Sequence, residues 1–366
     1  MKKLKKVIKT TIKPLYIIYK TIIFLVNDKK GESGKTVAYL FKISDWKSNY
    51  MDAFLNEYDI KIVPFHTNIR ILKYSVEKYD RKVFIIWGFN EDPSIRDYAF
   101  KHNIPIYRLE DGFVRSKGLG SLHSPPYSIS LDKKGMYFDS TQESDLEHLL
   151  NTFRFNEEPE IIDRARQAID KLLHLRISKY NHVDKRNIEE LYGIKTTKRI
   201  LVIGQVEDDA SIQKGSAIRW TNNDAVILAR KENPDAEIIY KPHPDVLTGR
   251  RPLQSDPQEI KHLARVIEEP LSLVDSLETI DHVYTITSLS GFEALIRGIK
   301  VTTLGAPFYS GWGLTDDRQL VSRRKRTLSI EELFAGAYIL YPRYADPHSK
   351  QKLSLEETID IISNVG

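Results

Sequence analysis

Short apolar runs rich in β-branched residues alternate with amphipathic stretches from residue 36 onward, and this alternation predicts the elements of the fold. The predicted strands of the first half are residues 37–41, 60–63, 83–87 and 104–108. The stretches between them, such as residues 68–79 and 93–102, are polar or amphipathic. Strands that alternate with helices in this way form βαβ units, so the pattern predicts a parallel sheet with both faces covered.

A long charged segment, residues 143–195, separates this series from a second one. It shows helical periodicity at residues 145–152 and 159–174 and no strand pattern, so we interpret it as a helical connector. The second series has predicted strands at residues 199–204, 237–240, 282–286 and 300–304, and predicted helices at residues 223–232, 271–276 and 291–297. Helical patterns around residues 331–337 and 355–363 follow.

These elements predict an α/β fold of the GT-B type, in which two Rossmann-like lobes are joined by the connector and a terminal helix crosses back. A length of 366 residues also exceeds what one hydrophobic core usually organises. The predicted parts are an N-terminal segment 1–35, a first lobe with connector 36–190, a second lobe 191–330 and a tail 331–366. Ligands of open α/β sheets bind beyond the carboxyl ends of the strands, which places the expected active site in the cleft between the lobes.

The N-terminal segment is basic and then apolar. Six lysines precede residue 14, and residues 15–26 are nearly all apolar apart from Lys20 and Thr21. This run is about half of the ~20 residues that span a bilayer, and no small-residue cleavage site follows it. We favour a basic amphipathic helix on an anionic inner leaflet, and hence a cytoplasmic protein peripheral to the inner membrane. The alternative is a first helix that docks on the protein itself with a solvated lysine face.

The composition limits the kinds of catalysis and the partners that are possible for this chain. The chain has no cysteine, and its ten histidines form neither an HExxH motif nor a close pair, so thiol catalysis is excluded and a metal site has no support. The net charge of +5 suits acidic partners such as nucleotides, anionic sugars or lipid, and is too small to indicate nucleic acid. Residues 31–36 imitate a P-loop, but Lys29 occupies the position of its first glycine and no strand precedes it, so we reject this motif.

Two turns of the second series suit a phosphate. Lys241-Pro242-His243-Pro244 directly follows a predicted strand, and its prolines fix the direction of His243. Lys241 can act as a point charge and His243 as a hydrogen-bond donor. The alternative is a rigid loop with a structural histidine.

The second of these turns follows the predicted strand 282–286 and opens a helix. Ser288 and Ser290 stand at the start of that helix, where unpaired N–H groups favour anions, and we assign them to a nucleotide phosphate. Glu293 is assigned to the ribose hydroxyls. Simple helix capping is the alternative, because Glu293 also has capping-box spacing from Ser290. The neighbouring Lys241 turn, at the same edge of the sheet, favours nucleotide binding.

Two acidic segments are candidates for catalysis. Glu207, Asp208 and Asp209 stand in a row after the first strand of the second series, and one of them can be a nucleophile or a base. Gln205 of the same loop joins the candidate donor-binding residues. In the first lobe, Glu110 and Asp111 precede a glycine at a strand end and can supply an acid/base group, with Arg115 as a clamp for an anionic sugar. The alternatives are a solvated acidic loop and a turn with a surface ion pair.

Two further segments have less definite interpretations. Residues 305–315 are dense in aromatic residues, glycine and proline, which suits a loop that forms a wall for a sugar or a base. The basic run at residues 323–326 indicates a solvated face, or a contact with an acidic glycan or lipid.

Taken together, these segments resemble the capsule polysaccharide biosynthesis family typified by the KpsC β-Kdo transferases. The resemblance is carried by residues 104–121, 127–151, 200–212, 240–246, 288–315 and 338–347. It implies a GT-B-like fold, a CMP-β-Kdo donor, no metal or other cofactor, and a retaining reaction. It also implies partners: a glycan or lipid-linked acceptor and other capsule assembly proteins.

The resemblance further assigns roles to single residues. His243, Ser288 and Ser290 would hold the CMP phosphate, Asp209 would attack the anomeric carbon, and Glu110, with Asp111 second, would transfer the proton. Two departures stand out. A typical member carries two such modules and this chain carries one. A glycine often precedes the nucleophile where this chain has Asp208, which leaves the choice between Asp208 and Asp209 open.

Two other functions compete with Kdo transfer. One is an inverting, sialyltransferase-like enzyme, since a His-Pro turn and a serine pair also serve CMP-sialic acid; residues 110–113 and 311–315 argue against it. The other is a non-catalytic capsule assembly or export factor, against which the retained Glu110, Asp111 and Asp209 argue.

Overall fold

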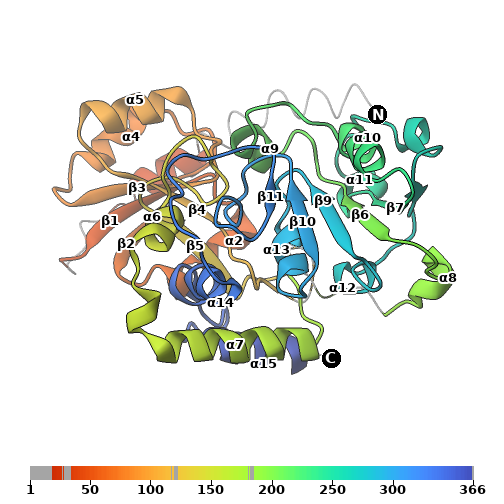
Figure 1. The fold of residues 1–366 in the computed structure, drawn as a ribbon. Helices are drawn as coiled ribbons and strands as arrows, with labels where there is room; N and C mark the ends of the chain where they lie inside the picture. Colours follow the sequence, from red (N-terminus) through yellow and green to blue (C-terminus); the bar gives the residue numbers. More distant parts are fainter. Residues whose placement is uncertain are drawn as a thin grey trace, which may run out of the picture.

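Two six-stranded sheets form the framework of the protein (Figure 1). The computed structural model describes residues 19–26, 28, 34–116, 118, 123–179, 181 and 185–364. The first sheet has the order β12-β5-β4-β3-β1-β2. Its strands are β1 (Thr36–Phe41), β2 (Tyr58–Ile62), β3 (Lys82–Trp87), β4 (Ile106–Asp111), β5 (Ser128–Asp132) and β12 (Arg343–Tyr344). Strands β1 to β4 are parallel to their neighbours, whereas β5 is antiparallel to β4, and β12 to β5.

The second sheet is parallel throughout and has the order β11-β10-β9-β6-β7-β8. Its strands are β6 (Arg199–Ile203), β7 (Glu237–Lys241), β8 (Arg265–Val266), β9 (His282–Thr285), β10 (Lys300–Thr303) and β11 (Asp316–Asp317). All five residues of β6 are buried, as expected of a central parallel strand with helices on both faces. The predicted α/β fold with two parallel-rich, Rossmann-like sheets is therefore confirmed.

Helices cover both faces of the sheets, because successive side chains of each strand point to opposite faces. In the first sheet, Tyr39 and Phe84 face the core under α4 (Ile69–Val76) and α5 (Pro93–Lys101), whereas Leu40 and Ile85 face the core under α3 (Met51–Phe54). Successive strand residues point to opposite faces, so these two cores lie on the two sides of one sheet. The helices around the second sheet are α9 (Ala210–Gly215), α10 (Asn222–Glu232), α11 (Pro244–Leu247), α12 (Leu273–Ser276) and α13 (Leu289–Leu295). The short α2 (Asp45–Ser48) follows β1, and the 3-10 helix η3 (Pro257–Ile260) precedes β8.

The predicted helical connector is present and packs against the C-terminal tail. It contains α6 (Asp145–Thr152), the 3-10 turn η2 (Phe155–Glu157), α7 (Pro159–His174) and α8 (Ile188–Tyr192). The tail contains α14 (Ile330–Phe334), the π-helical η4 (Ala335–Leu340) and α15 (Leu355–Asn364). Arg164 of α7 pairs with Glu356 of α15 at 2.6 Å, and Lys171 pairs with Asp360 at 2.7 Å. The tail thus returns to the first sheet through β12 and closes over the connector (Figure 1).

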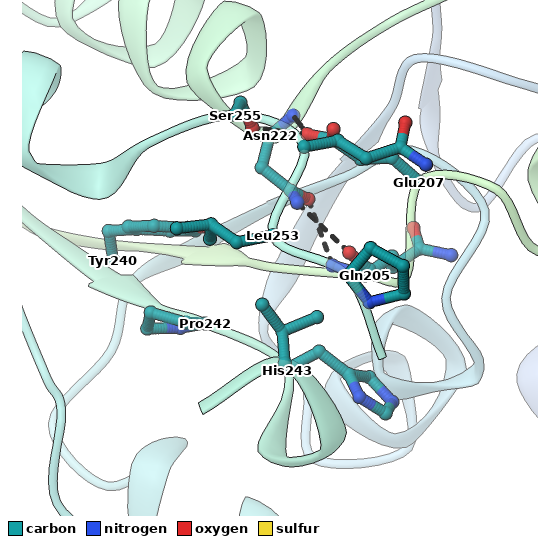
Figure 2. A pocket seen from close by; sticks show the side chains of 11 residues that line it. Gln205, Glu207, Asn222, Tyr240, Pro242, His243, Leu253 and Ser255 are labelled. Atoms are coloured by element: carbon teal, nitrogen blue, oxygen red, sulfur yellow. Dashed lines mark hydrogen bonds between the residues drawn. The ribbon is translucent and has the colours of Figure 1, made fainter. Parts of the chain in front are cut away.

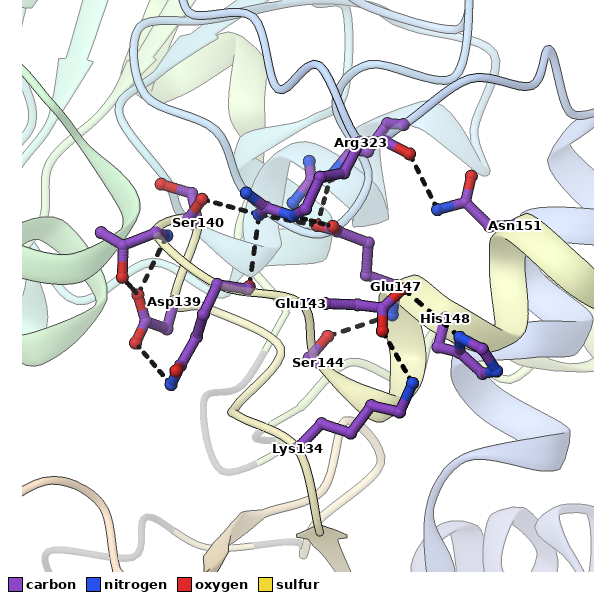
Figure 3. Close-up of polar contacts among 12 residues, drawn as sticks. Lys134, Asp139, Ser140, Glu143, Ser144, Glu147, His148, Asn151 and Arg323 are labelled. Atoms are coloured by element: carbon purple, nitrogen blue, oxygen red, sulfur yellow. Dashed lines mark hydrogen bonds and ion pairs between the residues drawn. The ribbon is translucent and has the colours of Figure 1, made fainter.

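The basic run 323–326 has neither of its two predicted roles, because it fastens the second half of the chain to α6. The Nε atom of Arg323 lies 2.6 Å from Glu147 Oε1, and that of Arg324 lies 3.1 Å from Glu147 Oε2 (Figure 3). Arg324 also donates to the carbonyl and the hydroxyl of Ser310, both at 2.9 Å, and its side chain is 2% exposed. Arg326 donates to the carbonyl of Phe153 at 2.7 Å. Only Lys325 of the run is exposed.

This clamp gives the first prediction. Glu147→Gln removes the only carboxylate that contacts the buried Arg324 among the described residues, and a buried charge that loses its partner costs about 3–5 kcal/mol. We expect a loss of that order in the free energy of unfolding, measured by urea denaturation. Glu143→Gln is the matched control, since its pair with Lys134 is 36–38% exposed and is worth at most ~1 kcal/mol. Equal losses in the two variants would show that the hydrogen bonds to Pro307 and Ser310 alone hold Arg324.

The aromatic side chains of the loop 305–315 belong to the core and do not form the predicted wall for a ligand. Phe308, Tyr309 and Trp312 are at most 5% exposed. Phe308 packs on Phe113 of the first sheet's strand-end segment with 4.9 Å between ring centroids, and Phe113 stacks on Tyr338 at 5.2 Å. These aromatic side chains therefore join the two sheets and the tail into one hydrophobic cluster.

Candidate active site

The loops that follow β6, β7 and β9 meet at one edge of the second sheet, because parallel strands present their carboxyl ends together. Gln205, which follows β6, joins two of them: its Nε2 donates to Thr287 Oγ1 at 3.1 Å, and its Oε1 accepts from the Thr287 amide at 2.8 Å. Its backbone pairs with the side chain of Asn222 (Figure 2). Gln205 is 7% exposed, and its side chain links the loops after β6 and β9. It also lines the small hollow beside His243, so its predicted role in binding the CMP-sugar stays a prediction.

The Lys241-Pro242-His243-Pro244 turn presents two polar groups at this edge. His243 is the N-cap of α11, and its Nδ1 accepts from the Asp245 amide at 3.1 Å. That bond makes Nδ1 the acceptor of the neutral ring, so Nε2 carries the proton and can donate to a ligand. Burial lowers the pKa of His243, which favours the neutral ring, and burial lowers the pKa of Lys241 to about 8. A small hollow lies beside His243, bordered by Glu207, Leu253 and Ser255 (Figure 2).

The three consecutive carboxylates of the acidic loop have different environments. Glu207 accepts from the Asn222 amide at 2.6 Å and from the Ser255 hydroxyl. Asp208 is exposed and pairs with Arg251 at 2.6 Å. Asp209 is the N-cap of α9, and Ser211 donates to its Oδ1 from both the amide (2.9 Å) and the hydroxyl (2.7 Å).

Asp209 is therefore held in one orientation through a single oxygen. Its charge raises the pKa of His243 against the larger effect of burial, which places the two side chains within electrostatic range. The attack on an activated sugar requires a carboxylate held in one orientation, here Asp209, and a hydrogen-bond donor that suits the leaving phosphate, here His243.

The serine pair begins α13 as predicted. Ser288 is the N-cap and accepts from the Ser290 amide at 3.2 Å, so helix capping accounts for one of the two hydroxyls. Both serines are half-buried. Gly291 permits the close packing of Tyr309, since an added Cβ would lie 2.2 Å from the Tyr309 hydroxyl, and this hydroxyl donates to the Ser288 carbonyl.

Glu293 points into the protein. It is 3% exposed, and its Oε1 accepts from the Lys179 amide at 3.2 Å. Burial raises its pKa to about 7, although Arg297 and Lys179 act in the opposite direction. Contact with ribose hydroxyls, the role predicted from the sequence, would require this side chain to become exposed.

The second acidic segment ends β4 in the first sheet. Burial and the neighbouring Asp111 raise the pKa of Glu110 to about 7. Burial raises the pKa of Asp111 too, but the charges of Lys47 and Arg115 outweigh it and hold this pKa below its usual value. Lys47 Nζ lies 3.6 Å from Asp111 Oδ1 and 3.3 Å from the centroid of the Trp87 ring. Two adjacent carboxylates thus differ in proton affinity, which is the usual arrangement of an acid/base group beside a charged support.

The buried side chain of Arg115 supports this segment. It is 0% exposed, and its guanidinium contacts Asp111 at 2.9 Å, the Ser116 hydroxyl at 2.7 Å and the Ser124 carbonyl at 3.0 Å. A side chain enclosed in this way holds Asp111 in place, and it does not reach a ligand as the predicted clamp would.

Two connections bring the first-sheet and second-sheet groups toward each other. Gly88 lies next to Glu110, and the adjacent Phe89 ring is 4.9 Å from Lys214 Nζ in α9, the helix that Asp209 caps. The charge of Lys179 in the connector lowers the pKa of Glu110, Asp111 and Glu293, so Lys179 is near all three carboxylates. The loop after β3, which lies beside Glu110, is therefore close to α9, the helix that Asp209 caps.

Sequence reasoning missed Lys47 and Lys179. Lys47 lies in α2, directly after the end of β1, and that position at a strand end was the available signal. Lys179 lies in the connector, where nothing in the local sequence distinguishes it from the other basic residues.

Comparison with known proteins gives matches over most of the chain. The family model described as capsule polysaccharide biosynthesis protein matches residues 84–344. The lipopolysaccharide-processing protein LpsZ of Rhizobium meliloti is 44% identical over 310 residues, which are 85% of this chain and 70% of LpsZ. The capsule polysaccharide modification protein LipA of Neisseria meningitidis serogroup B is 37% identical over 337 residues, 91% of this chain but only 46% of LipA.

Two solved structures have the same fold. They are described as the β-Kdo 2,4 transferase and the β-Kdo 2,7 transferase of KpsC from Thermosulfurimonas dismutans. Their TM-scores are 0.76 and 0.72, each is 33% identical, and the matches cover 90% of this chain and 98% and 99% of those chains. With the family match over residues 84–344 and the identities to LpsZ and LipA, the chain belongs to the capsule polysaccharide biosynthesis family.

Proposed function

We propose that this protein is a retaining glycosyltransferase of the GT-B type that moves Kdo from CMP-β-Kdo to a glycan or glycolipid acceptor in capsular polysaccharide or O-antigen synthesis. The observation that carries the proposal is the fixed Asp209 carboxylate, whose charge acts on His243 of the Lys241–Pro244 turn. Two Kdo transferases at 33% identity and TM-scores above 0.7 support the same activity.

The donor would bind at the strand ends of the second sheet. Lys241 supplies a cation whose lowered pKa makes it sensitive to a nearby phosphate, and a bound phosphate would favour its charged form. His243 donates from Nε2, and the Ser288–Ser290 turn offers a hydroxyl and backbone N–H groups. These groups would hold the CMP phosphate and stabilise its charge as it leaves.

The reaction would proceed by double displacement. The carboxylate of Asp209 attacks the anomeric carbon, a carbon–oxygen bond to Asp209 forms, and the bond to the CMP phosphate breaks with its electron pair leaving on CMP. An acceptor hydroxyl then attacks the same carbon, its proton passes to Glu110, and the bond to Asp209 breaks. Two inversions give net retention.

Transfer by the purified protein tests this function. The protein would be supplied with CMP-Kdo generated in situ and a synthetic Kdo-terminated acceptor, with CMP-sialic acid as a parallel donor. We expect one added Kdo on the acceptor by mass spectrometry, and release of CMP. Use of CMP-sialic acid alone would replace Kdo by another acidic sugar, and binding of CMP-Kdo without CMP release would indicate a non-catalytic assembly factor.

A further inference from the structure

The described helical residues 19–26 are attached to the first lobe through one side. The hydroxyl of Thr21 is 3.3 Å from that of Thr67, and Thr21 is 5% exposed. Phe24 packs on the core beneath α4 and α5. Asp28, which follows, is 7% exposed and lies 2.5 Å from Lys61 Nζ and 3.0 Å from the Tyr79 hydroxyl. Residues 19–26 are therefore docked on the protein through this side. The six lysines on which both predicted alternatives depend lie in residues 1–18, outside the described part.

The opposite side of the same helix is apolar and faces solvent. Tyr19, Ile22, Ile23 and Val26 are 59%, 54%, 37% and 73% exposed. Their spacing of three, one and three residues places them on one face, which we call the apolar stripe. This is the reverse of a helix that buries its apolar face on its own protein. Neighbouring exposed apolar side chains of this kind mark an interaction surface, whereas single ones do not.

The adjacent helix α4 continues this character. Its neighbours in the sequence, Thr67 and Tyr79, are the residues that contact Thr21 and Asp28, so α4 lies beside the anchored segment. Ile71 and Tyr74 of α4 are 44% and 63% exposed, and exposed Arg70 stands next to them. An aromatic ring and aliphatic groups beside a cation are typical of a surface at the lipid–water boundary.

The charge of the residues that precede the apolar stripe indicates what kind of surface the stripe contacts. The eighteen residues that precede it contain six lysines and no acidic residue. A symmetric dimer through the stripe would bring the two lysine-rich segments together, since an isologous interface pairs each patch with itself. An anionic bilayer accepts both features, because acyl chains receive the apolar side chains and headgroups attract the lysines. Among the described residues no helix has the length and apolar character needed to cross a bilayer, so the contact would lie in the plane of the surface.

We propose that the apolar stripe of Tyr19, Ile22, Ile23 and Val26 inserts into the surface of an anionic membrane and attaches the first lobe to it. The lobe that holds Glu110 is then the lobe next to the bilayer. This proposal is independent of the donor and of the reaction, because it rests on the exposed side chains of residues 19–26 and on the charge before them.

Vesicle flotation with the full chain tests the proposal. The vesicles would contain equal parts of phosphatidylglycerol and phosphatidylcholine, or phosphatidylcholine alone. We expect binding to the anionic vesicles, and a loss of at least about tenfold in the triple variant Ile22→Gln, Ile23→Gln, Val26→Gln, because the insertion of each aliphatic side chain contributes to affinity. The matched control is Ile194→Gln, Ile218→Gln, Leu320→Gln, which replaces aliphatic residues elsewhere that are on average more exposed than those of the stripe, and it should bind as the wild type does.

Two outcomes would overturn the proposal. Unchanged vesicle binding in the stripe variant, with binding lost only at high salt, would assign attachment to the lysines without insertion. A wild-type dimer that becomes a monomer in the stripe variant, measured by light scattering, would make the stripe a contact between copies. Circular dichroism melting of each variant shows that the fold is retained, and transfer activity in solution should stay at the wild-type level in both triple variants.

Discussion

Replacing Asp209 with asparagine is expected to reduce Kdo transfer by about 10⁴-fold or more, the size of effect seen when a covalent nucleophile is removed. Asparagine keeps an Oδ1 that can accept from the Ser211 amide and hydroxyl, so the N-cap of α9 and the fold should remain. The loss should appear in the rate of transfer, while CMP binding, measured by calorimetry, stays within a few-fold of the wild type.

Asp208→Asn is the matched control. Asp208 is exposed and its ion pair with Arg251 joins two half-exposed side chains, so we expect only a few-fold change in transfer. Incubation of the wild type with the donor alone should add one Kdo to the peptide that contains Asp209, read by mass spectrometry after proteolysis. Loss of transfer in Asp208→Asn, with activity kept in Asp209→Asn, would move the nucleophile to Asp208. Activity kept in both variants would contradict double displacement at this loop.

The central strands and the strand-end motifs could be predicted from the sequence because their signals are local. Strands β1, β3, β6 and β7 each contain a run of apolar residues, which is the sequence pattern of buried parallel strands. The Lys241–Pro244 turn stands directly after such a run, so its place at the sheet edge followed from the strand. Strand β4 lies two to three residues later than predicted, at Ile106–Asp111, which brings Glu110 and Asp111 into the strand itself.

Elements defined by distant partners could not be predicted. Strand β5 is a short run that becomes a strand by pairing with β4, and the two-residue β12 pairs with β5 across more than two hundred positions. The basic run 323–326 has the same sequence whether it faces water or Glu147, which comes from α6. The same holds for Arg115 and Gln205, whose burial is imposed by neighbouring loops and is invisible in their own segments.

Glu110→Gln is expected to slow the second half of the reaction, in which the acceptor loses its proton, by about 10²–10⁴-fold. The first half needs no such group, because CMP leaves as an anion. The glycosyl-Asp209 species should therefore accumulate in this variant, whereas in Asp209→Asn it should not form. Rapid quenching and mass spectrometry of the protein distinguish the two variants. A variant that neither transfers nor accumulates the adduct would remove Glu110 from this role.

The pH dependence should follow the pKa of Glu110, which burial and Asp111 raise to about 7. A base works when deprotonated, so the wild-type transfer rate should fall as the pH drops through about 7, and Glu110→Gln should lack this limb. Because Asp111 raises and Lys47 lowers this pKa, Asp111→Asn should move the limb to lower pH and Lys47→Met to higher pH.

Loss of stability would not explain these effects. The raised pKa means that the folded protein binds the Glu110 proton more tightly than the unfolded chain does, so its stabilising effect is complete below the usual value of 4.5 and is lost as the pH rises through about 7. Glu110→Gln is uncharged at every pH, and we expect it to be at least as stable as the wild type at pH 8, measured by urea denaturation. If the transfer rate of both Asp111→Asn and Lys47→Met fell at the same pH as that of the wild type, the ionisation that governs transfer would belong to another group.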